Sequence, residues 1–408
     1  MPTFLEFFAG GGMARLGLGS GWTCVFANDF DALKARAYTE NWGPAHLKTA
    51  DVASLTAADL PGRADLAWAS FPCQDLSLAG YGGGLDGKRS GTYWHFQRLL
   101  ADLEADGRAP RMIALENVYG AITSHGGDDL RSILGSLMDL GYTVGPMVLD
   151  ARDFVPQSRP RLFVVALKNS APLAIGLTQP LPDPRLHPRS LVSAVARLRP
   201  EHRASLVWWN LPAPPKRTAT LADVIEAEPQ GVKWHSEPET GRLLDLMSSV
   251  NRDKVRRAQK LGGPQVGALY RRTRAGVQRA EARFDGLSGC LRTPGGGSSR
   301  QTILIVDGRQ VRSRLISARE AARLMGLPDA YKLPARYNDA YHLLGDGLAV
   351  PVVEHLRRCL FEPLLAAGDD LHELPAVSGA AFEAAPGGPD SRPEGRMPGG
   401  AGRRAPAP

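Results

Sequence analysis

The chain has 408 residues, 43% of them hydrophobic, which is enough for two domains, and its formal net charge of +7 favours a polyanionic partner. Its four cysteines lie far apart without a C-x-x-C pair, which argues against a zinc site and a disulfide framework and suits a reducing cytoplasm. The first residues have no basic leader, and no apolar run approaches the ~20 residues of a membrane span, so we expect neither a signal peptide nor membrane association.

The first 167 residues alternate between apolar runs and helical patterns. We expect strands at residues 3–8, 23–28, 66–70, 112–116, 143–149 and 162–167. Between them lie helical patterns at residues 13–18, 32–41, 93–105 and 130–140. Strand-helix alternation implies a mostly parallel sheet that is covered by helices on both faces. The sequence therefore predicts an α/β, doubly wound (Rossmann-like) domain.

The amino-acid composition of the sequence changes near residue 168. Residues 172–215 are rich in proline, residues 252–283 are strongly basic, and helical patterns return at residues 317–325 and 350–365. After Gly368 the chain is dominated by Pro, Gly, Ala and Arg, a composition typical of disorder. We expect a catalytic domain at 1–167, a smaller inserted region at 168–312, a part completing the first domain at 313–367, and a disordered tail at 368–408.

A glycine loop, Phe8-Ala9-Gly10-Gly11-Gly12, follows the first expected strand. Glycines at the carboxyl end of a strand let a ligand approach the backbone. Asp29 ends the second strand, where its carboxylate is placed to accept from both hydroxyls of a ribose. Asp51 follows a further strand, presumed to lie before the run at 66–70, and is within reach of an adenine amino group. Helix capping or turn formation is the alternative for both aspartates.

Cys73 lies in Phe71-Pro72-Cys73-Gln74, directly after a strand that ends at Ser70. A lone cysteine is more often an inert core residue. Here a long glycine-rich loop follows, which is unusual for a core cysteine, and its Lys88 and Arg89 are placed to meet phosphates. A thiolate at Cys73 is the nucleophile that covalent catalysis requires.

Two further segments carry a carboxylate and a pair of arginines. Glu116 and Asn117 end the next expected strand, and Arg159 and Arg161 stand at alternate positions at a strand start, so they point to the same side. A solvated surface pair is the alternative for the two arginines. In this order, a thiol can attack a cytosine ring, a carboxylate can polarise it and two arginines can bind it.

The ordered motifs resemble those of DNA (cytosine-5) methyltransferases over residues 1 to about 365. The resemblance implies a class I methyltransferase fold, with residues 168–312 as the target-recognition region. It also implies that S-adenosylmethionine is the cofactor and that no metal is needed. The cofactor residues it implies are Phe8, Gly10, Gly12, Asp29, Phe30, Asp51, Val52, Pro72 and Leu348. Most relatives carry asparagine at the position of Leu348, so only a backbone contact is expected there.

The resemblance further implies the roles of the catalytic residues. Cys73 attacks C6 of a flipped-out cytosine, Glu116 contacts N3 and the 4-amino group as a proton donor, and Asn117 fixes the loop that carries Glu116. Arg159 and Arg161 stabilise O2 and help to position Cys73. Residues 290–301 look like a DNA-contacting loop, with a plain surface loop as the alternative.

The expected substrate is a specific sequence in duplex DNA, methylated by a monomer in the bacterial cytoplasm. The enzyme would act either beside a cognate restriction endonuclease or as an orphan methyltransferase. Methylation of RNA is the nearest rival, because one branch of the family acts on transfer RNA. A non-catalytic DNA-binding protein leaves the filled catalytic positions without a purpose. A nicotinamide oxidoreductase leaves Cys73, Glu116 and Arg161 unexplained.

Overall fold

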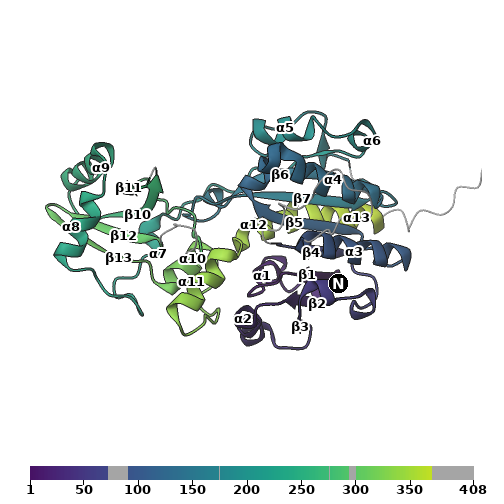
Figure 1. Ribbon diagram of the computed structural model, residues 1–408, viewed down its shortest axis with the longest axis horizontal. Coiled ribbons are helices and arrows are strands. Elements are labelled where there is room, and N and C mark those ends of the chain that lie inside the picture. Colours follow the sequence, from purple (N-terminus) through teal and green to yellow (C-terminus); the bar gives the residue numbers. More distant parts are fainter. Residues whose placement is uncertain (72–90, 174, 275, 294–299, 370–408) are drawn as a thin grey trace, which may run out of the picture.

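The structure of the chain is a computed structural model that describes residues 1–71, 91–173, 175–274, 276–293 and 300–369. It has a large domain built on one sheet and a smaller lobe built on another, joined through helices α10 (Ala318–Leu324) and α11 (Tyr337–Asp346), as Figure 1 shows. Among the described helices, none has both the length and the apolar character needed to cross a bilayer.

The large domain contains a seven-stranded sheet with the order β3-β2-β1-β4-β5-β7-β6. Strands β1 to β5 run parallel, and β7 lies antiparallel between β5 and β6. The strands are β1 Thr3–Phe7, β2 Thr23–Asp29, β3 Leu47–Thr49, β4 Leu66–Ala69, β5 Met112–Val118, β6 Tyr142–Asp150 and β7 Pro160–Lys168. The predicted doubly wound α/β class is thereby confirmed. The strand order reverses between β1 and β4, which is where open sheets of this kind bind ligands.

Helices cover both faces of this sheet because the strands alternate their side chains between two cores. Phe4 of β1 belongs to the core beneath α1 (Met13–Leu18) and α2 (Ala32–Trp42), whereas Leu5 and Phe7 belong to the core beneath α3 (Thr92–Ala105) and α4 (Asp128–Asp139). Short 3-10 turns occur at Val52–Ser54, Ala57–Asp59, Tyr119–Ile122, Ser124–Gly127 and Ala151–Asp153.

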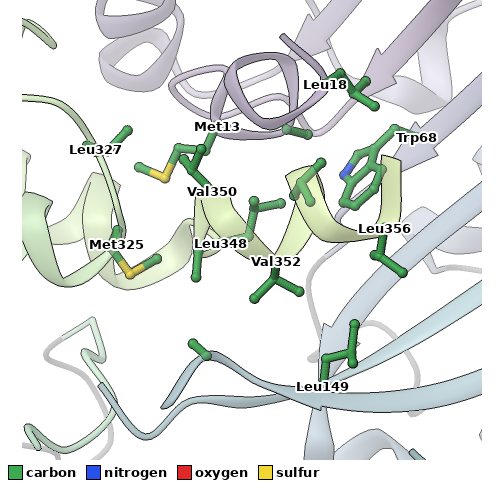
Figure 2. Packing of buried hydrophobic residues seen from close by; sticks show 14 of the residues in the cluster. Met13, Leu18, Trp68, Leu149, Met325, Leu327, Leu348, Val350, Val352 and Leu356 are labelled. Atoms are coloured by element: carbon green, nitrogen blue, oxygen red, sulfur yellow. The ribbon is translucent and has the colours of Figure 1, made fainter. Parts of the chain in front are cut away.

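The C-terminal segment packs into the first of these cores. Helix α12 (Val350–Leu356) continues through a π-helical turn, Arg357–Phe361, into α13 (Glu362–Asp369). Figure 2 shows Val350, Val352 and Leu356 of α12 between Met13 of α1 and the sheet residues Trp68 and Leu149. The end of the described chain is therefore an integral layer of the large domain.

The segment after β7 also returns to the large domain before the chain enters the smaller lobe. Helix α5 (Arg189–Val195) contributes Leu191 and Val195 to the core beneath α4. Strand β9 (Trp208–Trp209) pairs with β8 (Thr178–Gln179), and buried Trp209 donates its indole N–H to Gly145 O at 3.0 Å. The short helix α6, Pro200–Arg203, lies between α5 and β9.

The smaller lobe, here called the β10–β13 lobe, consists of a four-stranded antiparallel sheet in the order β11-β10-β12-β13 with helices α8 and α9. Its elements are α8 Glu237–Asp245, α9 Ser249–Lys260, β10 Gln265–Arg274, β11 Val277–Arg283, β12 Thr302–Asp307 and β13 Gln310–Leu315. One face of the sheet buries Leu269 and Leu304 against Met247 and Val255 in a small core of its own. The basic sequence pattern had not predicted these strands.

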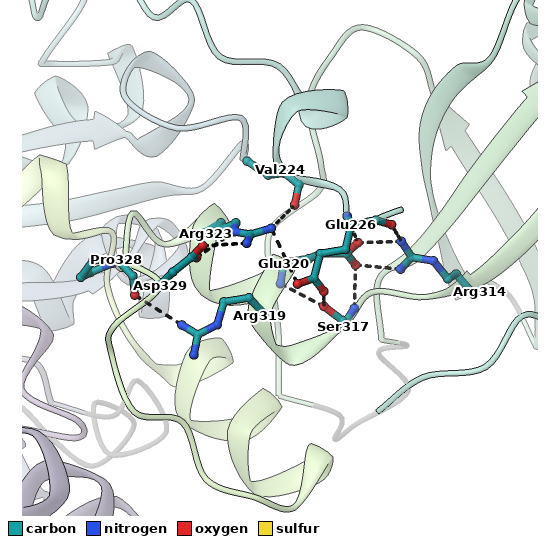
Figure 3. Close-up of polar contacts among 9 residues, drawn as sticks. All are labelled: Val224, Glu226, Arg314, Ser317, Arg319, Glu320, Arg323, Pro328 and Asp329. Atoms are coloured by element: carbon teal, nitrogen blue, oxygen red, sulfur yellow. Dashed lines mark hydrogen bonds and ion pairs between the residues drawn. The ribbon is translucent and has the colours of Figure 1, made fainter. Parts of the chain in front are cut away.

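A buried polar network joins this lobe to the rest of the molecule (Figure 3). Arg314 of β13 and Glu320 of α10 are both fully buried, with Nη2 and Oε1 2.6 Å apart. Glu320 also accepts from the backbone of Ser317, the N-cap of α10, and from the backbone N–H of Glu226 just after α7 (Leu221–Val224). Because both charges are paired and hydrogen-bonded, their burial is compensated.

Candidate active site

One cavity of about 530 Å³ lies at the carboxyl ends of the central strands, and residues from three distant parts of the chain line it. This volume is in the range typical of small-molecule sites. Among the predicted site residues, those lining the cavity are Phe8, Gly10, Asp29, Phe30, Glu116, Asn117, Arg159, Arg161 and Leu348. Pro72 and Cys73 lie outside the described residues, as do Lys88, Arg89 and residues 294–299 of the expected DNA loop.

The glycine loop and Asp29 form one half of the cavity. Asp29 is 5% exposed, and its two carboxylate oxygens accept from the backbone N–H groups of Gly10 at 2.8 Å and Asp31 at 2.9 Å. Burial raises the pKa of Asp29, while these two hydrogen bonds and Lys34 oppose the rise. Asp31, not Asp29, caps α2 by accepting from Leu33 and Lys34. Helix capping is therefore excluded for Asp29, whereas its bond to Asp31 N, two residues further on, is a turn of the kind that the alternative expected, and the cofactor role of Asp29 stays a prediction.

Three other predicted cofactor residues do not line the cavity. Asp51 is exposed and caps the turn Val52–Ser54 by accepting from Ala53 N at 2.8 Å, and the Val52 side chain is buried. Gly12 has φ 76°, and a Cβ there would lie 2.2 Å from the Trp42 indole nitrogen. Its glycine is thus required for close packing of α1 against α2. The cofactor roles of Asp51, Val52 and Gly12 stay predictions.

Glu6 is a cavity residue that the sequence analysis did not single out. It is 1% exposed, one of its oxygens accepts from Arg15 N at 3.3 Å, and within the described chain the other oxygen, Oε2, has no partner. Burial raises the pKa of Glu6 to about 8. An acidic residue inside an otherwise apolar strand, two positions before Phe8, was the available sequence signal.

Glu116 and Arg161 form the other half of the cavity. Arg161 Nε lies 3.1 Å from Glu116 Oε1, because the antiparallel register places Arg161 of β7 opposite Val118 near the end of β5. Asn117 donates from Nδ2 to Phe71 O at 3.1 Å and accepts at Oδ1 from Val118 N. It therefore fixes the end of β5 against the chain segment that leads to Pro72 and Cys73.

Arg159 contacts a different set of groups from Arg161. Its guanidinium is 2% exposed and donates to Leu291 O at 2.7 Å, to Gly345 O at 2.9 Å and to Gly347 O. Burial, with the nearby Arg161, lowers the pKa of Arg159 to about 10. The donors of Arg159 thus hold together the walls of the cavity, and of the two arginines only Arg161 pairs with Glu116.

The thiol of Cys290 lies beside Arg159. Cys290 Sγ is 3.3 Å from Arg159 Nη1. Burial alone would raise the pKa of the Cys290 thiol, but Arg159, Arg161 and Arg292 together hold it below its ordinary value. The sequence analysis placed Cys290 only in an expected DNA-contacting loop. Its position next to Arg159 depends on contacts across more than a hundred residues.

Asp29 with the glycine loop and the Glu116–Arg161 pair thus share one cavity at the edge of a doubly wound sheet, the arrangement that the sequence analysis expected of a methyltransferase. The sequence profile described as C-5 cytosine-specific DNA methylase matches residues 2–362. The chain therefore belongs to the C-5 cytosine-specific DNA methylase family. Membership identifies it as a DNA (cytosine-5-)-methyltransferase that depends on S-adenosylmethionine, and confirms the predicted family, enzyme class and cofactor.

Individual relatives agree with this assignment. The type II methyltransferase M.HpaII of Haemophilus parainfluenzae is 25% identical over 382 residues, covering 89% of this chain and 90% of its own. M.BsuFI of Bacillus subtilis is 27% identical over 367 residues, covering 90% and 74%. Among solved structures, the S. pombe Dnmt2 methyltransferase shares the fold with a TM-score of 0.56 at 20% identity, covering 89% of this chain and 99% of that one.

Proposed function

We propose that this enzyme methylates C5 of a cytosine that is flipped out of a specific duplex DNA sequence, through a covalent adduct with Cys73. The observation that carries the proposal is a cavity in which Asp29 and the glycine loop adjoin Glu116 and Arg161. A base cannot react inside a duplex, so the target cytosine must leave the stack, at a cost of a few kcal/mol.

The cofactor half of the cavity fits S-adenosylmethionine. Asp29 is a buried acceptor for ribose hydroxyls, and Phe30, 66% exposed, offers a ring face to an adenine. Glu6 Oε2, which has no hydrogen-bond partner among the residues that the structure describes, is an acceptor for a cationic part of the ligand. When bound, the cofactor supplies an electrophilic methyl group.

The other half of the cavity prepares cytosine to accept that methyl group. Attack of the Cys73 thiolate forms a bond to C6 and makes C5 nucleophilic; after methylation, loss of the C5 proton and of the thiolate restores the aromatic ring. Glu116 faces N3 and the 4-amino group, and Arg161, held by Glu116, stabilises charge at O2. Arg159 takes part indirectly, by holding the cavity walls.

The β10–β13 lobe supplies the contact with DNA. Arg272 and Arg279 are exposed and directly opposite each other on β10 and β11, on the sheet face that also carries Tyr270. A Cβ at Gly289 would lie 3.7 Å from the Tyr270 ring, so this face continues into the segment that brings Cys290 to the cavity. Arg271 points to the opposite face, shared with Leu269 and the core beneath α9. We infer that Arg272 and Arg279 meet phosphates.

The test is expression in a host that lacks cytosine methylation, followed by bisulfite sequencing of its genome. We expect 5-methylcytosine at one sequence motif, and none with Cys73→Ala. If that motif coincides with a restriction site of the source organism, the enzyme belongs to a restriction-modification pair; otherwise it is an orphan. Scattered methylation would refute sequence-specific recognition, and unmodified DNA beside methylated transfer RNA would favour the RNA rival.

A further inference from the structure

A bridge of three side chains connects the cofactor half of the cavity with the segment between β11 and β12. Lys34, in the first turn of α2, pairs through Nζ with Asp346 Oδ2 at 2.8 Å. The other oxygen of Asp346, Oδ1, accepts a hydrogen bond from Thr293 Oγ1. All three residues line the cavity. One carboxylate thus joins the helix that follows Asp29 to the chain that belongs to the β10–β13 lobe.

The backbone on both sides of this bridge is tightly packed. A Cβ at Gly345 would lie 2.8 Å from Thr293 N, and a Cβ at Gly347 would lie 2.4 Å from Met13 Sδ. Arg159 holds the same backbone by donating to Leu291 O and to Gly345 O. The backbone at Gly345–Gly347, which carries Asp346, therefore cannot shift without moving either Thr293 or Met13.

The bridge also acts on the charge of the cofactor site. Burial alone would lower the pKa of Lys34, but Asp346 chiefly, with Asp29 and Asp31, holds it above its ordinary value. Lys34 is in turn one of the groups that favour the ionised form of buried Asp29. A fixed Lys34 therefore helps Asp29 to remain a strong acceptor for ribose hydroxyls.

The bridge contributes little to folding. The Lys34 and Asp346 side chains are 23% and 42% exposed, and ion pairs with this much access to water are worth about 0–1 kcal/mol. Its position between two binding surfaces points instead to a role in binding.

We propose that Asp346 is a positioning residue that couples the binding of cofactor and DNA, an inference that rests on the function proposed above. DNA that contacts the β10–β13 lobe holds Thr293, which keeps Asp346 and, through it, Lys34 in place beside Asp29. Each ligand thereby favours the joined arrangement of the three side chains to which the other binds, so the second binds more tightly. Linkage requires the same factor in both directions.

The experiment measures the affinity of S-adenosylhomocysteine by calorimetry, alone and with a duplex carrying the sequence found by bisulfite sequencing. For the wild type we expect the duplex to tighten binding by about five- to tenfold, at the lower end of typical couplings. Thr293→Val keeps the Lys34–Asp346 pair but loses its link to the lobe, so the tightening, taken relative to the variant's own affinity without DNA, should fall below about twofold. Asp346→Asn should lose the tightening as well.

Two controls separate coupling from damage to the fold. Thr293→Ser keeps the hydroxyl and should restore the wild-type factor, and Asp339→Asn, at the other end of α11, should leave it unchanged. Full tightening in Thr293→Val, or none in a wild-type enzyme that methylates its DNA, overturns the coupling while the proposed function stands. A wild type that binds S-adenosylhomocysteine but never methylates DNA refutes the proposed function instead.

Discussion

The large domain and the β10–β13 lobe are stabilised in different ways. The large domain has a core on each face of its sheet, and strands such as β5 contribute to both. The lobe has a small core of its own on one face, while Ala268 and Ile303 on the other face join a core of the large domain. Its last strand is also tied to α10 by the buried Arg314–Glu320 pair. Hydrophobic burial thus stabilises the large domain, whereas hydrophobic contacts and a buried ion pair together place the lobe.

The largest effect is predicted for loss of the Arg314–Glu320 ion pair. Arg314→Leu leaves Glu320 buried without its charge partner, which should cost about 3–5 kcal/mol in the free energy of unfolding. Urea unfolding followed by tryptophan fluorescence measures the loss. Arg256→Ala, which removes an exposed pair with Asp253 (N–O 2.9 Å), is the matched control and should stay within about 0.5 kcal/mol. Equal stabilities for the two variants would show that the buried pair does not hold the lobe.

The second prediction separates binding from folding inside the large domain. Asp29→Ala should weaken S-adenosylmethionine binding by about 1–3 kcal/mol, because buried hydrogen bonds lose their acceptor. Asp31→Ala removes the cap of α2 instead, so it should lower stability by about 0.5–2 kcal/mol. Calorimetric titration and thermal unfolding of both variants check this division. Unchanged affinity in a folded Asp29→Ala variant would contradict the cofactor role.

The third prediction uses the pH dependence of Glu6. Its pKa in the folded chain is raised to about 8, above its unfolded value, so its contribution to stability is present at low pH and is lost as pH rises toward 8. In the absence of cofactor, Glu6→Gln should therefore gain about 2–4 °C in Tm relative to the wild type between about pH 6 and pH 8. Parallel Tm curves for the two proteins would mean that Glu6 does not titrate in this range.

The smallest effect distinguishes the two faces of the lobe. Arg272→Ala and Arg279→Ala should each reduce the slope of log affinity against log salt by about one unit, the signature of a lost phosphate contact. Arg271→Ala, on the opposite face, should leave the slope unchanged. Duplex binding across a salt series is the measurement. A reduced slope for Arg271→Ala alone would place the DNA on the α9 side of the sheet.

The same contrast explains how far the sequence could predict the structure. Six of the seven strands of the large domain were predictable, because strands buried on both faces are continuous apolar runs. The short strand β3 was presumed without bounds, because two of its three residues are exposed. The strands of the lobe were not, because β10 and β11 carry exposed arginines that read as a basic patch. The alternation of Arg159 and Arg161 predicted a shared side, but not their partners. Arg159 donates to Leu291 O and Gly345 O, and Arg161 pairs with Glu116. These partners depend on contacts between distant segments of the chain.

The central claim is covalent catalysis by Cys73 on the same cytosine that the Glu116–Arg161 pair is proposed to contact. A duplex with 5-fluorocytosine at the methylated position traps the adduct, because fluorine at C5 cannot be lost as a proton is. With S-adenosylmethionine, we expect a complex that resists denaturant for the wild type. We expect the same complex for Cys290→Ala, which lacks the thiol beside Arg159. Cys73→Ala should form none. A denaturant-resistant complex with Cys73→Ala, or its loss only in a folded Cys290→Ala variant, would contradict the account.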